Sequence, residues 1–433
     1  LLLLILSVSK WKWHPFIALI LAAMSMGLLL GLGGTRMVEV LLDGFSNTLK
    51  WIAIVVILGA FIGEVLRETG GALRISDSVV KWIGEKKLPW AMGITGYLVS
   101  IPVFVDVAYI VLQPVTEALA ARTKKPILVI GLALTAGLTV SHTLIPPTPG
   151  PLAVASLLNV NIGRMLLINA SVGVFAMVGG ILWASLFCKN IRIPYDDKLA
   201  KQAVKPETGD KTEKKRHSVL MDLLPILIPI VLMGAGAFYK TEDGSVTGQV
   251  MSLISTPMIA VLIGAGVAGI QYISLKGKGG MNKLVDQAIV KSALVIMITG
   301  AGGAFGYVIR EAGIQDSLGA FFAEMPYLGF LLPFMVAAVL TTATGSITVS
   351  LIGTASIVGP MVDSLPYSPE MMAALIGCGS FCVFHANGSF FWLLNRLHNV
   401  PVNILYRTYT LQSLVMGLAG LLGVMVLRLF GVA

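Results

Sequence analysis

The chain has 433 residues, of which 56% are hydrophobic and only 12% are charged. Soluble domains carry about 25% charged residues, so the composition predicts an all-α polytopic membrane protein. A membrane β-barrel would alternate apolar and polar residues along short strands, and this chain does not. The net charge of +9 is spread over short loops and one linker, which argues against a nucleic-acid partner.

Apolar segments run through the whole chain, and most are long enough to cross a bilayer or to enter it deeply. The first of them is short, and we interpret it as the end of a helix. The segments are residues 1–8, 14–34, 48–67, 88–121, 126–158, 165–188, 221–239, 253–275, 288–310, 326–362, 370–394 and 411–430. A highly charged stretch, residues 189–220, separates the two sets of six and is predicted to be a cytoplasmic linker between 1–188 and 221–433.

The two halves contain related sequences. GAFIGEVLRETG at 59–70 is similar to GAFGYVIREAG at 303–313, and Arg310 follows Arg67 by 243 positions. His385 follows His142 by the same 243 positions. Internal repeats in a membrane protein are typical of transporters that bind their substrate at the repeat interface.

The charges of the loops predict the orientation of each half. Basic residues flank segment 88–121 on both sides, so it is expected to be a re-entrant hairpin that opens to the cytoplasm. Acidic flanks without Lys or Arg predict that hairpin 326–362 opens to the outside. The sequence thus predicts two inverted-topology repeats, each with about five transmembrane helices plus one re-entrant hairpin. Both termini are expected outside.

Two further segments are predicted to be discontinuous helices at the centre of the membrane. Segment 126–158 contains VSHTLIPPTPGP, and segment 370–400 contains FCVFHANGSFFW. Proline lacks the N–H that an unbroken helix needs. Irregular backbone at membrane depth is tolerated where it lines a cavity, and the N-termini of half-helices attract anions. A simple proline kink, or hydrogen bonding between helices, is the alternative.

Three ionisable residues lie at these interruptions and are candidates for proton coupling. Asp106 lies near the first hairpin tip, and an intramembrane carboxylate is a functional candidate by default. It could instead cap a helix. His142 and His385 can carry a proton, or each can hold a broken helix to its neighbour.

The predicted substrate-binding residues are glycine and small polar residues at the same places, because hydroxyl, amide and backbone N–H groups bind carboxylates and hydroxyls. They are Ser100, Thr143, Thr344, Gly345, Ser346, Thr348, Asn387 and Ser389. The sequence contains no P-loop, zinc-protease or serine-hydrolase motif. We therefore expect no enzyme activity, metal or cofactor, with the proton as coupling ion. A passive channel is the remaining alternative.

Four stretches resemble the gluconate permease family: IPVFVDVAYIVLQP, SHTLIPPTPGPLAVAS, GAGGAFGYVIREAGIQDSLG and GSITVSLIGTASIVGP. The resemblance implies a secondary active transporter of the bacterial inner membrane that couples protons to gluconate or a related small sugar acid. Some members take D-serine instead. The resemblance also implies a homodimer in which a transport domain moves against a scaffold, as in an elevator. One departure is Gly388, where relatives often carry Asp.

Overall fold

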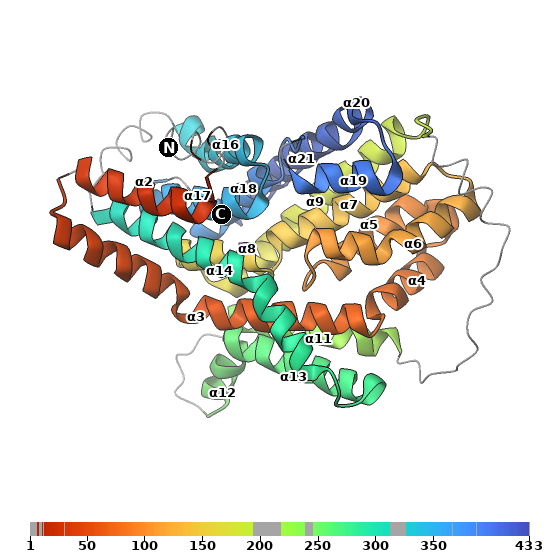
Figure 1. The fold of residues 1–433 in the computed structure, drawn as a ribbon, viewed down its shortest axis with the longest axis horizontal. Helices are drawn as coiled ribbons and strands as arrows, with labels where there is room; N and C mark the ends of the chain where they lie inside the picture. Colours follow the sequence, from red (N-terminus) through yellow and green to blue (C-terminus); the bar gives the residue numbers. More distant parts are fainter. Residues whose placement is uncertain are drawn as a thin grey trace.

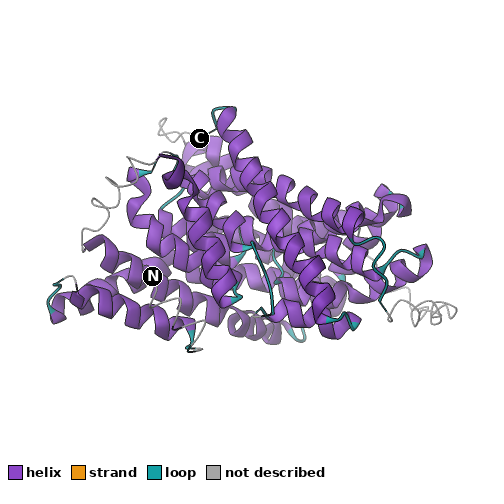
Figure 2. Ribbon diagram, turned by 90° about the horizontal axis from the view of Figure 1, so that it is seen from above, coloured by secondary structure: helices purple, strands orange, loops and turns teal. Residues whose placement is uncertain are grey.

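The structure is a computed structural model that describes residues 7, 11, 13–29, 31–193, 218–238, 246–311, 326–365, 367–386 and 388–432. Within these ranges every regular element is a helix (Figure 2). Most of the predicted linker and Asn387 lie outside the described residues.

The helices of the first half belong mainly to apolar segments. They are α2 (Pro15–Leu29), α3 (Gly34–Glu68), α4 (Gly71–Ile83), η1 (Glu85–Lys87), α5 (Leu88–Val99), α6 (Val105–Thr123), α7 (Ile127–Leu144), α8 (Pro149–Leu158) and α9 (Ile162–Phe187). Among the described residues of both halves, five helical spans are long and apolar enough to cross a membrane. The number is six if the bent α3 is counted as one span. Residues Ile127–Leu158 form one of these spans.

The second half has a similar content of helices. They are α11 (Val219–Phe238), α12 (Val246–Ser255), α13 (Pro257–Lys276), α14 (Met281–Glu311), α16 (Pro326–Thr344), α17 (Ile347–Val358), η3 (Gly359–Ser364), α18 (Pro369–Ser380), α19 (Ser389–His398), α20 (Val402–Leu405), η4 (Tyr406–Thr410, a π-helical turn) and α21 (Leu411–Leu429).

Helices stop where proline and glycine leave the backbone without regular hydrogen bonds. Helix α5 ends before Pro102, and α7 ends before Pro146 and Pro147. Gly345, between α16 and α17, has a φ of 70°, a left-handed conformation that glycine adopts without strain. The fourth interruption separates α18 from α19. These four breaks position the site described below.

Helices α3 and α14 form a long antiparallel pair (Figure 1). The start of α3 is joined to the end of α14 by Arg36 and Glu311, whose side chains are 2.8 Å apart. The opposite ends are joined by an ion pair between Lys291 of α14 and the buried Glu64 of α3. A Cβ at Gly303 would lie 2.6 Å from the Gly44 carbonyl oxygen, so the two backbones are in close contact between these ends.

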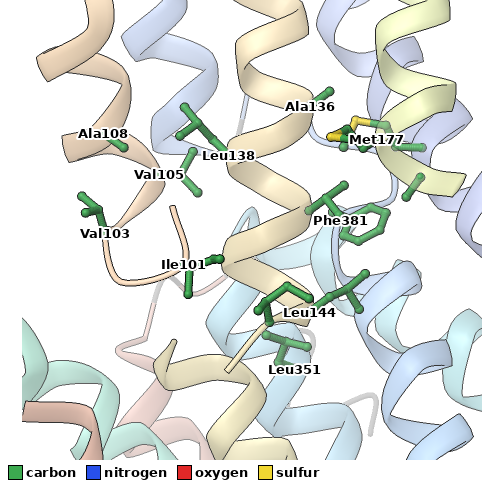
Figure 3. Packing of buried hydrophobic residues seen from close by; sticks show 14 of the residues in the cluster. Ile101, Val103, Val105, Ala108, Ala136, Leu138, Leu144, Met177, Leu351 and Phe381 are labelled. Atoms are coloured by element: carbon green, nitrogen blue, oxygen red, sulfur yellow. The ribbon is translucent and has the colours of Figure 1, made fainter. Parts of the chain in front are cut away.

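A second group of helices packs around α7, which is buried along its whole length. Helices α5, α6 and α9 pack on α7, and α21 packs against α9 and α18. Figure 3 shows Ile101 and Val103 on the turn between α5 and α6, beside the helix that carries Leu138 and Leu144. The buried turn is therefore part of the hydrophobic core.

Candidate functional site

The four helix breaks lie close together in space, and three of them border one cavity of about 210 Å³, here called the central cavity. Its wall comes from the turn before α6, the second half of α7, the α16–α17 break, the α18–α19 break and η4. The lining residues are Phe104, Val105, Asp106, Thr139, His142, Gly345, Ser346, Ile347, Thr348, Phe384, His385, Gly388, Phe390, Phe391 and Tyr409.

Three helices begin at the central cavity. Their N-cap residues are Phe104 for α6, Ser346 for α17 and Gly388 for α19, and all three line the wall. The first backbone N–H groups of a helix have no partner within that helix, and the helix dipole adds positive potential there. A negatively charged group of a ligand would therefore be stabilised between these three helix ends.

Asp106, in the first turn of α6, is the acidic residue among the described residues of this wall. Its side chain is exposed at the cavity. None of the ion pairs found among the described residues includes Asp106. Among the residues that the structure describes, no Lys or Arg lines the cavity. The carboxyl group is thus available to a proton or to a bound cationic group.

The two histidines that are 243 positions apart both line the central cavity, but their environments differ. His142 is 8% exposed, and within the described part of the chain its Nδ1 has no hydrogen-bond partner. Its ring lies 5.5 Å from that of Phe104. His385 donates its Nε2 hydrogen to the Thr342 carbonyl oxygen at 2.8 Å, because a carbonyl can only accept. His385 therefore holds the α18–α19 break to the end of α16.

Three predicted substrate-binding hydroxyls do not line the cavity. Ser100 donates to the Val103 carbonyl oxygen at 2.8 Å and stabilises the turn before α6. Thr143 and Thr344 donate to the carbonyls of Thr139 and Leu340, both at 2.7 Å, one helical turn earlier. Each of these hydroxyl protons is therefore already donated to a nearby backbone carbonyl.

The structure places Gly345, Ser346 and Thr348 on the cavity wall. Ser346 accepts a hydrogen bond from the Val349 N–H at 3.3 Å and so caps α17. A Cβ on Gly388 would lie 3.2 Å from the Gly345 carbonyl oxygen, so the two breaks are in close contact. Ser389 is the first residue of α19, and Asn387 lies outside the described residues.

Sequence reasoning missed an aromatic wall. Phe384 stacks on Tyr409 at 5.8 Å between ring centroids, and Phe390 and Phe391 lie 5.8 and 6.3 Å from Tyr409. Tyr409 belongs to the π-helical turn, a feature that is common at functional sites. The density of aromatic residues at 381–392 was the available signal, but nothing in the sequence connected it to Tyr409.

The fold and the cavity together define a helical membrane transporter, and comparisons with known proteins identify its family. A family model described as GntP family permease matches residues 1–430. The chain is 32% identical to a gluconate permease of Pseudomonas aeruginosa, covering 98% of this chain and 95% of the relative. It is 30% identical to a D-serine transporter of Escherichia coli K12, covering 98% and 96%. The chain belongs to the GntP permease family.

A solved structure has the same fold. The YdaH transporter of Alcanivorax borkumensis superposes with a TM-score of 0.69 at 15% identity, covering 97% of this chain and 99% of that chain. The protein is thus a membrane-integral permease and not an enzyme. The resemblance that the sequence motifs indicated is confirmed at the level of the family.

Proposed function

We propose that this permease is a secondary active transporter that carries gluconate, or a related small sugar acid, together with protons across the bacterial inner membrane. The observation that carries the proposal is the convergence of three helix N-caps and Asp106 on the central cavity. The substrate carboxylate would lie at the N-termini of α17 and α19, near Ser346 and Gly388. The hydroxyl groups of the substrate would bind to Ser346, Thr348 and, as the sequence predicts, Asn387 and Ser389.

The same arrangement explains how protons would be coupled to the substrate. A bound carboxylate and the Asp106 carboxylate repel each other in one small cavity when both are charged. Binding of the anion and protonation of Asp106 therefore favour each other, and by linkage the effect is reciprocal. His142, which has an unsatisfied ring nitrogen within the described part of the chain, is the second candidate for the coupled proton.

Two relationships support inverted repeats and an elevator-type movement. Helices α3 and α14 carry the corresponding residues 59–68 and 302–311, yet they run antiparallel, as an inverted repeat requires. Their equivalent glycines, Gly63 and Gly306, contact the turn before α6 and helix α17, respectively. The α3–α14 pair would be the scaffold, in a homodimer, and the hairpins with the broken helices would move along its glycine faces.

A second cavity supports this division. It measures about 300 Å³ and lies where α3 and α14 face α8 and α17. Asn47 and Tyr307 line it from the scaffold side, and Ser156 and Ser356 line it from the other side. Space between the two groups of helices is what a moving interface needs.

The test of coupling is Asp106→Asn in proteoliposomes, with labelled gluconate. We expect the variant to lose accumulation driven by a pH gradient but to keep exchange between internal and external gluconate, because exchange needs no net proton movement. Asp77→Asn, which changes an exposed carboxyl on α4, is the matched control and should behave as the unmodified protein. Undiminished pH-driven accumulation in Asp106→Asn would contradict a role for this carboxyl.

A proton-coupled permease for D-serine or another small amino acid is the second candidate. It is favoured by the unpaired state of Asp106 among the described ion pairs, because an ammonium group would bind that carboxylate. Competition distinguishes the two substrates. If unlabelled D-serine displaces labelled gluconate poorly and other sugar acids displace it well, the sugar-acid proposal holds.

A further inference from the structure

Tyr109 and His398 form a buried polar pair outside the central cavity. The Tyr109 hydroxyl oxygen and the His398 Nε2 are 2.8 Å apart, and they share a hydrogen bond. Tyr109 has no exposed surface and His398 is 2% exposed. A Cβ at Gly131 would lie 2.5 Å from the tyrosine oxygen, so α7 closes the pair on that side. An ionisable side chain buried at membrane depth is costly and requires a specific reason.

An acidic residue accompanies the pair. Glu117 lies on α6 two turns beyond Tyr109, and it interacts electrostatically with both Tyr109 and His398. Its Oε1 accepts a hydrogen bond from the Gln113 side chain at 2.8 Å. Tyr109, Gln113 and Glu117 are spaced by four residues, so they form one polar stripe along α6. Arg396 and Arg407, the cations nearest in sequence to His398, are both exposed.

The pair is directly connected to the central cavity. The Tyr109 ring packs edge-on against Phe390 at 5.3 Å, and Phe390 lines the cavity. Tyr109 is one turn beyond Asp106 on α6, and His398 is at the far end of α19. Because α6 and α19 both begin at the cavity, the hydrogen bond between Tyr109 and His398 joins two of the helices that form the cavity wall.

We propose that Tyr109, His398 and Glu117 form a second proton-exchanging site, beside the central cavity, that does not contact the substrate. His398 would take up a proton at a ring nitrogen, with the Glu117 carboxylate stabilising the imidazolium, and would release the same proton when the cavity opens to the other side. Tyr109 is a positioning residue that orients the imidazole. The proposal rests on the proposed proton-coupled function and adds a second titrating group to Asp106.

The decisive variant is His398→Gln. A glutamine side chain can still hydrogen-bond the Tyr109 hydroxyl but cannot carry a proton at neutral pH, so the packing is kept and the titration is removed. We expect loss of gluconate accumulation driven by a pH gradient, and retained gluconate exchange. The pH profile of the remaining uptake should lose one of its inflections. Tyr109→Phe should displace the same inflection, because it leaves the imidazole in place but no longer orients it.

The matched control is Tyr367→Phe. It also removes a buried tyrosine hydroxyl, which donates to the Gly329 carbonyl oxygen at 3.0 Å, away from α6 and α19. This variant should keep both accumulation and exchange. The proposal is wrong if His398→Gln leaves accumulation and its pH profile unchanged. It is also wrong if accumulation and exchange fall together, because the hydrogen bond between Tyr109 and His398 would then only stabilise the structure.

These outcomes separate this inference from the proposed function. If the unmodified protein shows no pH-driven accumulation of gluconate, the proposed function fails before any variant is compared. If the unmodified protein accumulates gluconate and Asp106→Asn abolishes this while His398→Gln does not, only the second proton site fails.

Discussion

At the scale of single residues, the central cavity is lined by residues at which helices begin or end. Ser346 is the clearest example, since it caps α17 through the Val349 N–H and lines the cavity. Ser100 has a similar chemistry, but its hydroxyl is committed to the Val103 carbonyl. Which of two serines faces a ligand is decided by the local turn and not by the type of residue.

A prediction follows for Ser346→Ala. Loss of an N-cap serine costs about 1 kcal/mol of stability, and here a hydroxyl is also removed from the cavity wall. We expect a lower thermal midpoint and a higher KM for gluconate uptake. Ser368→Ala is the matched control, because Ser368 caps α18 by accepting from the Met371 N–H at 3.3 Å. It should lower the thermal midpoint to a similar extent and leave KM unchanged.

The role of the Ser346 hydroxyl follows from comparing the KM values of the two variants. Equal KM values in Ser346→Ala and Ser368→Ala would remove the Ser346 hydroxyl from the substrate site. Purified protein in detergent gives the thermal midpoint, and initial rates in proteoliposomes give KM.

At the scale of elements, glycine allows the α3–α14 pair to approach the breaks closely. A Cβ at Gly63 would lie 2.3 Å from the Pro102 carbonyl oxygen, in the turn that leads to Phe104 and Asp106. Corresponding contacts are made by Gly59 with the Pro147 carbonyl and by Gly302 with Ile352. The repeat of glycines in the sequence is thus matched by a repeat of close contacts.

We therefore predict that Gly63→Ala impairs transport. Overpacking at a buried contact costs about 1–3 kcal/mol, and the displaced turn carries one wall of the cavity. The maximal rate of gluconate uptake should fall, and the thermal midpoint should fall with it. Gly266→Ala is the control, because its Cβ would meet nothing within 4 Å on the exposed side of α13. That variant should gain up to about 1 kcal/mol and keep its rate; an unaffected Gly63→Ala would contradict close packing at the turn.

At the scale of the whole molecule, the question is whether the broken helices move against α3 and α14. The Ile352 Cβ is 3.7 Å from the position of a Cβ at Gly302, which is close to the separation of about 3.8 Å in a disulfide. Gly302→Cys with Ile352→Cys, in a background without Cys188, Cys378 and Cys382, should therefore form a disulfide between α14 and α17. We expect oxidation to stop both accumulation and exchange, and reduction to restore them.

A matched cross-link lies outside this interface. A Cβ at Gly420 on α21 would be 3.5 Å from the Ala176 Cβ on α9, and neither helix belongs to a hairpin or a broken helix. Gly420→Cys with Ala176→Cys should form a disulfide without stopping transport. Full transport with the α14–α17 bond formed would exclude movement of α17 along α14.

The helical class, the membrane location and the family could be read from the sequence, because they depend on composition, the length of apolar runs and local motifs. The prolines at 146–151 and the glycine at 345 also predicted where helices stop, since backbone hydrogen bonding is a local property. The residues of the site were harder to predict from the sequence. Gly345, Ser346 and Thr348 lie at the cavity, but Thr143 and Thr344 turn their hydroxyls to the preceding helical turn.

What the sequence determined by itself is a polytopic helical permease of the GntP family, with breaks in its helices. The tertiary structure decided which breaks meet, because Asp106 and Tyr409, which line the same cavity, are brought there by packing between segments more than 300 positions apart. It alone placed Tyr109 against His398, 289 positions apart. Hydrogen bonds and burial between distant helices leave no local pattern in the sequence, so these groups become visible only in the folded molecule.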